Sequence, residues 1–301
     1  CGRRSVRRAR RLIACGCDGV KLLEGKPTMR RAFPIPDFDL PAWEPFWAYA
    51  EKARLPILWH VNDPETFWDP DAIPPFARDA GWGYTDADVN NEDQYRQVRA
   101  VLERHKNLNV TFAHLFFLSA DLPRLSEWME RFPNMRVDLT PGIELYENLS
   151  KTPEETRAFF ERFSDRILYG TDIGGRTVLA ETVTALNENE SIRRAEICGA
   201  FLESKATLGI RADGAFLIGT EPFALHGMDF DADLLNKILS ENFLAFVGAD
   251  RPRRVNLRAA LRACRRLRHT LINRARRTGR PCDTRAVDSD RQYFVHALDE
   301  L

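Results

Sequence analysis

The sequence predicts an α/β fold of the TIM-like (β/α)8 barrel type, with about the last five strands present. Short apolar segments recur along residues 18–171, and a segment with helical periodicity separates each from the next. Such alternation indicates parallel strands joined by crossover helices. Three of the segments end at His60, His114 and Asp172, whose side chains can carry out chemistry. Because the strands of a parallel barrel all end on one face, these three residues are expected to meet there.

The first part of the chain shows both periodicities. Apolar residues at helical spacing predict a helix over residues 3–14, which Gly16 ends. Residues 19–23 then form an apolar run that predicts the first strand. Trp43, Phe46, Trp47 and Ala50 give the next helix its apolar stripe, and a strand follows over residues 55–60.

A long connection over residues 61–90 follows the strand that ends at His60. It is rich in aromatic residues and prolines, and a loop of this length in a compact domain is usually a lid, a binding segment or disordered. Its aromatic content argues against disorder. We therefore expect a lid whose Trp68, Trp82 and Tyr84 contact a substrate, with packing on the surface as the alternative.

The second part of the chain continues the alternation up to Asp172. Helices are predicted over residues 92–105 and 119–132, and strands over residues 109–114, 135–139 and 166–171. The sequence Thr152-Pro-Glu-Glu155 has the form of a capping box and predicts a helix that starts there. Beyond Asp172 the pattern loosens, with a short strand expected at residues 216–219 and a helix over residues 232–246.

The number of strands predicts that the barrel is incomplete at its N-terminal side. Five strands precede Asp172, whereas a closed barrel needs eight. The three missing strands would lie upstream of Cys1, and the absence of an initiator methionine agrees with a fragment or a trimmed chain. We expect the sheet to be open on one side, with the apolar flanks of the 19–23 strand exposed.

Charge divides the chain into two predicted parts. The 301 residues carry a formal net charge of zero, but residues 251–301 hold fourteen arginines against five acidic residues. We assign residues 1–250 to the partial barrel and residues 251–301 to an arginine-rich helical or flexible extension. Such an extension could bind nucleic acid or an acidic partner. A solvated appendage is the preferred interpretation, because no aromatic residues alternate with the arginines.

Several classes of protein are excluded by composition and motif. The chain has no run of eighteen apolar residues, no signal-type segment, no Gly-x-Ser-x-Gly motif and no Walker loop. Its six cysteines form no paired framework, which is typical of a reducing, cytoplasmic setting. The expected ligand is a small molecule and not a membrane or nucleic acid, and assembly into a homo-oligomer is left open.

The three strand-end residues point to metal-assisted chemistry. Imidazole and carboxylate groups are good ligands for Zn²⁺ and similar divalent ions. A catalytic zinc lowers the pKa of its bound water, and a nearby histidine or aspartate can take the proton. His60, His114 and Asp172 together therefore predict a metal-dependent hydrolase.

The chain also resembles the amidohydrolase-related metal-dependent hydrolases, the branch that includes aminocarboxymuconate-semialdehyde decarboxylase. The resemblance runs from about Asp18 to Gly248. It rests on segments that include Gly19-Val-Lys-Leu-Leu, Trp59-His60, Thr111-Phe-Ala-His114, Val137-Asp-Leu-Thr-Pro-Gly142, Ile167-Leu-Tyr-Gly-Thr-Asp172 and Asn242-Phe-Leu-Ala-Phe-Val-Gly248. The order His, His, Asp at strand ends is its specific part.

The resemblance implies a role for each strand-end residue. His60 matches the fifth-strand metal ligand, and His114 matches the sixth-strand histidine that polarises water or substrate. Asp172 matches the eighth-strand carboxylate, which serves as a metal ligand and in catalysis. The family's first-strand His-x-His pair has no counterpart, since no histidine precedes His60. The implied cofactor is a divalent metal, with zinc as the preferred ion, and this chain as given is expected to bind it weakly or not at all.

Further residues and activities stay open at this point. Lys21 is interpreted as a structural or substrate-contacting residue, Arg176 as a candidate for binding a substrate carboxylate, and Glu144 and Tyr146 as either pocket or loop residues. Hydrolysis of a small organic substrate is the leading prediction. The alternatives are nonoxidative decarboxylation of an aromatic or unsaturated acid at the same site, and a catalytically inactive barrel that acts as an interaction module.

Overall fold

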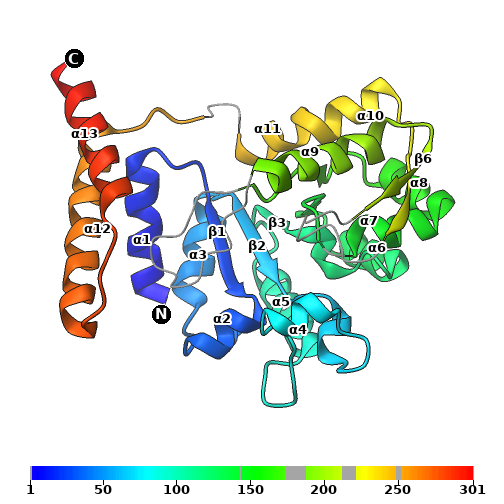
Figure 1. Ribbon diagram of the computed structural model, residues 1–301, viewed down its shortest axis with the longest axis horizontal. Coiled ribbons are helices and arrows are strands. Elements are labelled where there is room, and N and C mark those ends of the chain that lie inside the picture. The colour runs from blue at the N-terminus through cyan, green and yellow to red at the C-terminus, as the bar shows by residue number, and fades with distance from the viewer. Residues whose placement is uncertain (1, 143, 174–187, 212–221, 249–251, 301) are drawn as a thin grey trace.

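Five parallel strands form the centre of the computed structural model, which describes residues 2–142, 144–173, 188–211, 222–248 and 252–300 (Figure 1). The strands lie side by side in the order in which they occur in the chain. They are β1 (Val20–Gly25), β2 (Ile57–Val61), β3 (Val110–Phe112), β4 (Met135–Asp138) and β5 (Ile167–Leu168). Each neighbouring pair is parallel, so the predicted α/β architecture, strand order and direction are confirmed.

Two strands are shorter than predicted by three residues or more. The 109–114 segment leaves the sheet after Phe112, because the backbone enters a left-handed turn at His114. The 166–171 segment ends at Leu168, since the Tyr169 amide donates to Ile238 O at 2.9 Å and not to a neighbouring strand. Both departures lie at the carboxyl ends of the strands, where the backbone turns out of the ladder.

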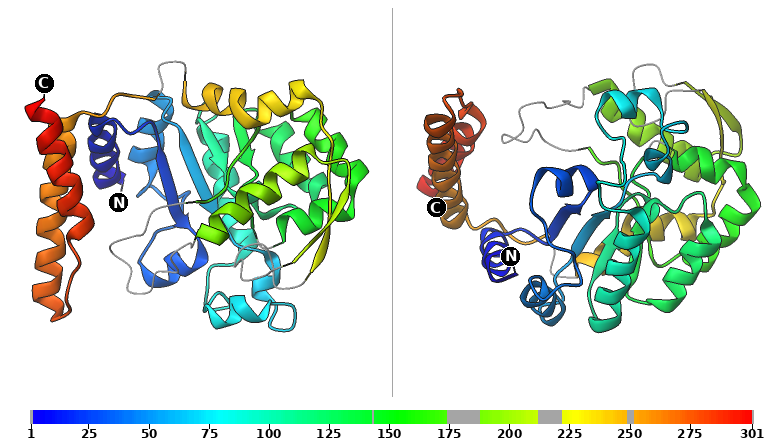
Figure 2. Two further views of the ribbon diagram at one scale, coloured as in Figure 1. Left: turned by 45° about the horizontal axis from the view of Figure 1, so that its top comes forward. Right: turned by 90° about the horizontal axis from the view of Figure 1, so that it is seen from below.

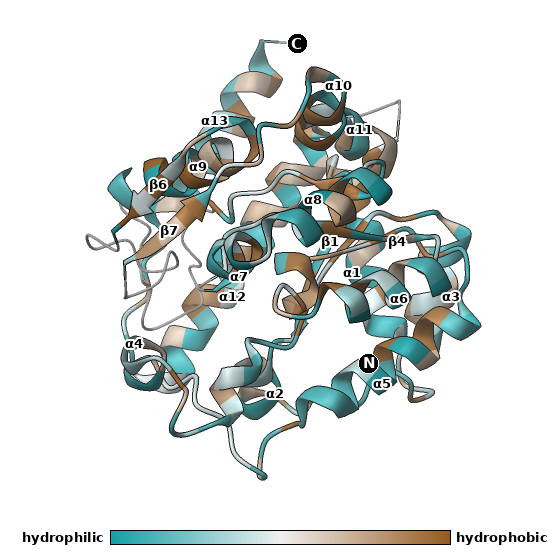
Figure 3. Ribbon diagram, turned by 90° about the vertical axis from the view of Figure 1, so that its right-hand side faces the viewer, coloured by the Kyte–Doolittle hydropathy of each residue, from teal (hydrophilic) through white to brown (hydrophobic). Residues whose placement is uncertain are grey.

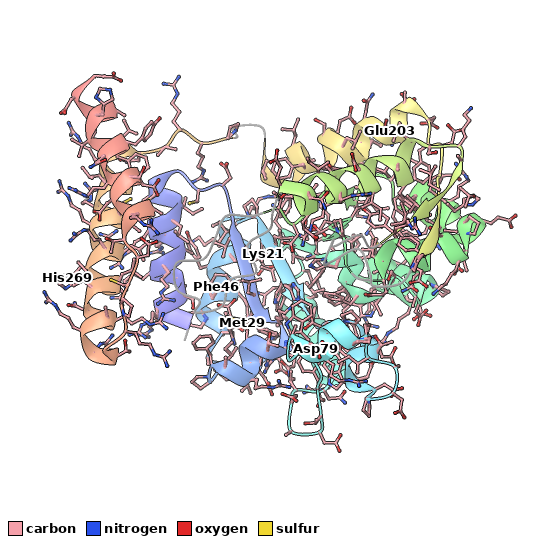
Figure 4. The ribbon with its side chains drawn as sticks, viewed as in Figure 1. Lys21, Met29, Phe46, Asp79, Glu203 and His269 are labelled. Atoms are coloured by element: carbon pink, nitrogen blue, oxygen red, sulfur yellow. The ribbon has the colours of Figure 1, made fainter. Side chains whose placement is uncertain are left out.

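The fold is TIM-like, but the sheet is not closed into a barrel. Within the described ranges β1 pairs only with β2, and β5 pairs only with β4. On β1, Leu23 is 44% exposed while Leu22 is buried, in agreement with the exposed apolar flank expected for an open sheet. Lys21 lies on the same strand, near the middle of the molecule (Figure 4).

Helices fill the connections between the strands. The helices before β5 are α1 (Gly2–Cys15), α2 (Pro27–Ala32), α3 (Glu44–Lys52), α4 (Pro75–Asp79), α5 (Asn91–Arg104), α6 (Leu122–Arg131), α7 (Leu145–Lys151) and α8 (Pro153–Arg162), with 3₁₀ turns η1 (Glu65–Trp68) and η2 (His114–Phe117). The elements after β5 are α9 (Glu188–Glu203), an antiparallel pair of strands β6 (Thr207–Ile210) and β7 (Phe223–His226), α10 (Ala232–Asn236), the π-helical turn η3 (Lys237–Glu241), α11 (Asn242–Val247), α12 (Leu257–Thr278) and α13 (Arg285–Asp299).

Three local predictions in this part of the chain have different outcomes. Helix α8 begins at Pro153 as predicted, but the Thr152 side chain makes no capping hydrogen bond, because its φ of −129° and ψ of 63° are not those of a regular cap. The helix predicted over residues 232–246 is present with a π-helical turn in its middle. The strand predicted at residues 216–219 lies outside the described residues.

The core lies between the sheet and the surrounding helices. Trp59 on β2 is fully buried, and its ring lies 4.8 Å from that of Trp47 and 5.6 Å from that of Phe112 between centroids. Such aromatic pairs stabilise a core beyond the area that they bury. Figure 3 shows hydrophobic colouring concentrated on the strands and the inner faces of the helices, and hydrophilic colouring on the outer faces.

The arginine-rich C-terminal segment forms two long helices in its described part. Helices α12 and α13 pack against each other, and α12 also contacts α1. The pair lies at one end of the molecule, away from β3, β4 and α6 (Figure 2). Nowhere in the described ranges is a helix both long enough and apolar enough to cross a bilayer.

A glycine on β1 gives a direct test of how closely the first two strands approach. A Cβ atom on Gly25 would lie 2.2 Å from His60 O and 2.8 Å from Val61 Cα, and both neighbours are backbone atoms. We expect Gly25→Ala to lower the free energy of unfolding by about 1–3 kcal/mol, because the strands must separate locally. Denaturant unfolding measures the change. Gly209→Ala is the control, since nothing lies within 4 Å of its Cβ position, and an equal loss in both variants would contradict the steric reason.

Candidate active site

The ends of β2 and β3 bring two of the predicted site residues together. His60 is the fourth residue of β2, and His114 follows β3 by two residues. The register pairs Trp59 with Phe112, so both histidines lie at the same edge of the sheet. Their rings lie 5.2 Å apart between centroids, at an angle of 76°, and both residues are buried.

His114 is held by an unusual backbone turn. Residues 114–117 all adopt left-handed conformations, with φ values between 49° and 59°. Four consecutive non-glycine residues in this region are strained, because each Cβ is crowded by the following carbonyl oxygen. The turn is fixed by Asp138 on β4, whose Oδ1 accepts from the His114 amide at 2.8 Å and from the Thr140 amide at 3.1 Å. Strain of this kind, held by a neighbouring strand, is typical of a functional site.

The hydrogen bonds of the His114 ring define its tautomer. Its Nδ1 lies 3.1 Å from Thr140 O. A carbonyl oxygen only accepts, so Nδ1 carries the proton and Nε2 is the acceptor of the uncharged ring. Burial, together with the nearby charges of His60 and Lys21, lowers the pKa of His114 to about 4, although Asp138 and Asp172 oppose the change. His114 Nε2 can therefore accept a proton at neutral pH.

A second buried group, which sequence analysis did not identify, surrounds Asp63. Its Oδ1 lies 3.4 Å from His60 Nε2 and 3.2 Å from Lys26 Nζ, and its Oδ2 accepts from the Tyr84 hydroxyl. Burial by itself would raise the pKa of Asp63, but Lys26, His60 and Tyr84 together lower it to about 2. Burial also lowers the pKa of His60, against the effect of Asp63. Asp63 is thus an ionised carboxylate that orients His60.

In the part of the chain that the structure describes, the direct contacts of Asp172 are with Arg194 and not with the two histidines. Its carboxylate side chain is 45% exposed, and its Oδ2 lies 3.5 Å from Arg194 Nη1. The same guanidinium donates to Asp172 O at 2.9 Å, and its Nε lies 2.9 Å from Glu190 Oε1. The charge of Asp172 acts on His114 and on Lys21. Asp172 therefore belongs to the same electrostatic group, whereas its direct contact is with α9.

The aromatic segment, which is the connection over residues 61–90 that carries Trp68, Trp82 and Tyr84, contacts the site at Asp63. Tyr84 bonds to that carboxylate, and the Trp68 ring lies 4.6 Å from the Tyr84 ring between centroids. Lys26 Nζ lies 4.6 Å from the centroid of the Trp82 ring. The segment thus lies beside the histidine cluster, while contact with a substrate stays a prediction for all three aromatic residues. Arg176 lies outside the described residues.

The described residues supply only part of a metal-binding set. Among them, no three His, Cys, Asp or Glu side chains are grouped closely enough to hold an ion. His114 Nδ1 bonds to Thr140, and the Asp172 carboxylate lies against Arg194. Because a catalytic zinc usually takes three protein ligands, the described side chains do not by themselves complete a zinc site.

Three residues of the site, Asp138, Asp63 and Arg194, were not predicted, and the sequence patterns that could have indicated them differ in strength. Asp138 interrupts the apolar Val137-Asp-Leu139 run, and a charge inside a buried strand is a signal that could have been used. Asp63 follows His60 by three residues, which is a weaker signal. Arg194 lies on a helix that begins far along the chain from Asp172, and no local pattern connects the two.

Comparison of the sequence with known families gives one match over most of the chain. A family model described as Amidohydrolase matches residues 3–249. No curated protein sequence matches the chain. The matched range contains every described residue of the site, whereas α12 and α13 lie beyond it.

Several solved structures are similar in part. An uncharacterised TIM-barrel protein from Bordetella bronchiseptica is 18% identical, with 57% of this chain and 50% of that chain covered and a TM-score of 0.35. A Pseudomonas putida protein provisionally named 2-pyrone-4,6-dicarboxylic acid hydrolase is 14% identical, with 82% and 68% covered and a TM-score of 0.39. A 2,6-dihydroxybenzoate decarboxylase is 16% identical, with 70% and 56% covered and a TM-score of 0.34. The chain spans 50% of the first of these structures, and with all three TM-scores below 0.5 the family assignment rests on the sequence match.

Proposed function

The chain belongs to the amidohydrolase family, and on this basis we propose that its site hydrolyses a small organic substrate. One observation carries the proposal. The buried His114 ring has its Nδ1 engaged by Thr140 O, so its Nε2 is left as a proton acceptor beside His60. An acceptor of this kind is what a general base requires.

In the proposed reaction His114 removes a proton from water. The strained turn and Asp138 hold the ring in place, so no reorganisation is needed when the proton is transferred. His60, oriented by Asp63, supplies a second polar group at the same edge of the sheet. Asp172 favours the imidazolium that forms, because its negative charge acts on His114.

The aromatic segment is proposed to cover the bound substrate. Trp68, Trp82 and Tyr84 are held near His60 through Asp63 and Lys26. A cover of aromatic side chains would exclude water and strengthen the electrostatic interactions inside. Arg176 stays a proposed contact for a substrate carboxylate, and His60 and Asp172 stay the proposed ligands of a divalent metal, which needs at least one ligand more.

The experiment is a substrate panel that separates the reaction classes. Esters, amides, lactones and aromatic carboxylic acids are incubated with the protein, with and without added Zn²⁺, and both acid release and CO₂ release are measured. Hydrolysis predicts acid release without CO₂. Release of CO₂ from the carboxylic acids would replace the proposal with nonoxidative decarboxylation. No turnover under any condition would favour the inactive interaction module.

A further inference from the structure

Glu144 is a carboxylic acid beside the candidate active site that the proposed reaction leaves unused. The residue is partly buried as a whole, but its Oε2 is completely enclosed and has no hydrogen-bond partner among the described residues. It occupies the cap position before α7 without making a side-chain capping bond. Buried carboxylates are normally paired, so an unpaired oxygen here indicates a protonated group or one that meets a ligand.

Gly142, two residues before Glu144, packs directly on His114. A Cβ atom on Gly142 would lie 3.8 Å from both Cβ and Nδ1 of His114, and 3.9 Å from Leu145 Cβ. The Tyr146 hydroxyl donates to Leu139 O at 2.7 Å, which ties the segment to the end of β4. Glu144 therefore lies between Gly142 and Tyr146, which are held at the same edge of the sheet as the histidines.

The surroundings of Glu144 favour its protonated form. Burial, together with the negative charges of Asp63 and Glu147, raises the pKa of Glu144 to about 7, although a hydrogen bond to its own backbone opposes the change. Asp63, another carboxylate of the cluster, accepts from Tyr84 and pairs with Lys26. His114 contributes an acceptor nitrogen. Glu144 thus differs from its neighbours in being able to give a proton away at neutral pH.

We infer that Glu144 is the proton donor of this site, and this assignment rests on the proposed hydrolysis. A water O–H bond breaks, its proton goes to His114 Nε2, and the oxygen forms a bond to the substrate carbonyl carbon while the π electron pair of that carbonyl moves onto its oxygen. That pair then re-forms the carbonyl bond as the bond from the carbon to the leaving atom breaks, and the leaving atom takes the electron pair of the broken bond and the Glu144 proton. Transfer of the proton on His114 to the Glu144 carboxylate, through solvent, restores both groups.

Infrared titration of the purified chain tests the protonation of Glu144 without any substrate. We expect a carboxylic-acid band that disappears with a midpoint near pH 7, where the pKa of Glu144 lies, and that Glu144→Gln removes. Glu155→Gln, at an exposed position in the first turn of α8, should leave the band unchanged. The inference is overturned if the band survives Glu144→Gln, or if every carboxyl group titrates near the ordinary value of about 4.3.

Kinetics with matched leaving groups tests the role of the donor. An alkyl ester needs a proton on its leaving oxygen, whereas a 4-nitrophenyl ester of the same acid leaves readily as the anion. Glu144→Gln should lower kcat for the alkyl ester about 10²-fold or more, with little change in KM, and should affect the 4-nitrophenyl ester much less. Equal losses for both esters would overturn the role. If the unaltered protein hydrolyses neither ester nor any other panel member, the proposed hydrolysis fails, and the titration still decides whether Glu144 holds the proton.

Discussion

Replacing Arg194 with methionine is expected to lower the free energy of unfolding by about 3–5 kcal/mol, the typical cost of breaking a buried ion pair from one side. The Arg194 side chain is 2% exposed, and its Nε lies 2.9 Å from Glu190 Oε1. Its Nη1 also donates to Asp172 O at 2.9 Å. Methionine fills a similar volume but leaves the Glu190 carboxylate buried without the guanidinium. Denaturant unfolding monitored by circular dichroism gives the change.

Two further variants show whether charge burial is the cause. Adding Glu190→Gln to Arg194→Met should restore part of the lost stability, because it removes the buried charge that the guanidinium had balanced. Arg162→Met breaks an exposed pair with Glu130 and should cost no more than about 1 kcal/mol. A loss in Arg194→Met as small as that in Arg162→Met would show that α9 does not stabilise the Asp172 segment in this way.

Replacing His114 with asparagine is expected to lower kcat about 10²- to 10⁴-fold for whichever substrate the panel identifies. Asparagine tolerates the left-handed conformation at this position, where φ is 56°, and its amide can still donate toward Thr140 O. The variant therefore keeps the turn but lacks the Nε2 acceptor. Steady-state kinetics over a range of pH measures the loss, and circular dichroism checks the fold.

The same substitution at two other histidines, His105 and His60, provides the controls for His114→Asn. His105→Asn removes a buried histidine whose Nδ1 lies 2.9 Å from Glu51 Oε2, outside the site, so it should affect stability and leave kcat unchanged. His60→Asn should lower the stoichiometry of any bound zinc, measured by elemental analysis, whereas His114→Asn should not. If His114→Asn releases the metal and His60→Asn retains it, the proposed roles of the two residues are reversed.

The architecture could be predicted because it depends on local patterns. Along a strand such as Ile57–Val61, most side chains on both faces of the sheet are apolar, which is typical of strands that are covered on both faces. Alternation with amphipathic helices then implies parallel strands in chain order, as observed. The candidate pair His60 and His114 followed from the same reasoning, because adjacent parallel strands place their carboxyl ends together.

Strand ends and the partners of the site residues were less predictable. The 109–114 segment looks like a strand throughout, but Asp138 on the next strand binds the His114 amide and turns the backbone left-handed. The contacts of Asp63 with Lys26 and Tyr84 join residues 37 and 21 positions away. No periodicity encodes contacts of this kind.

The sequence by itself determined the sheet, its order and the position of two histidines at one edge, because backbone hydrogen bonding and apolar periodicity act over a few residues. Only the tertiary structure decided which charges lie together. It paired Asp172 with Arg194 of α9, engaged the His114 ring with Thr140, and enclosed the Oε2 atom of Glu144 without a hydrogen-bond partner in the described chain. The physical reason is that the protonation and orientation of a buried side chain depend on the distance to every neighbouring charge, and folding sets those distances.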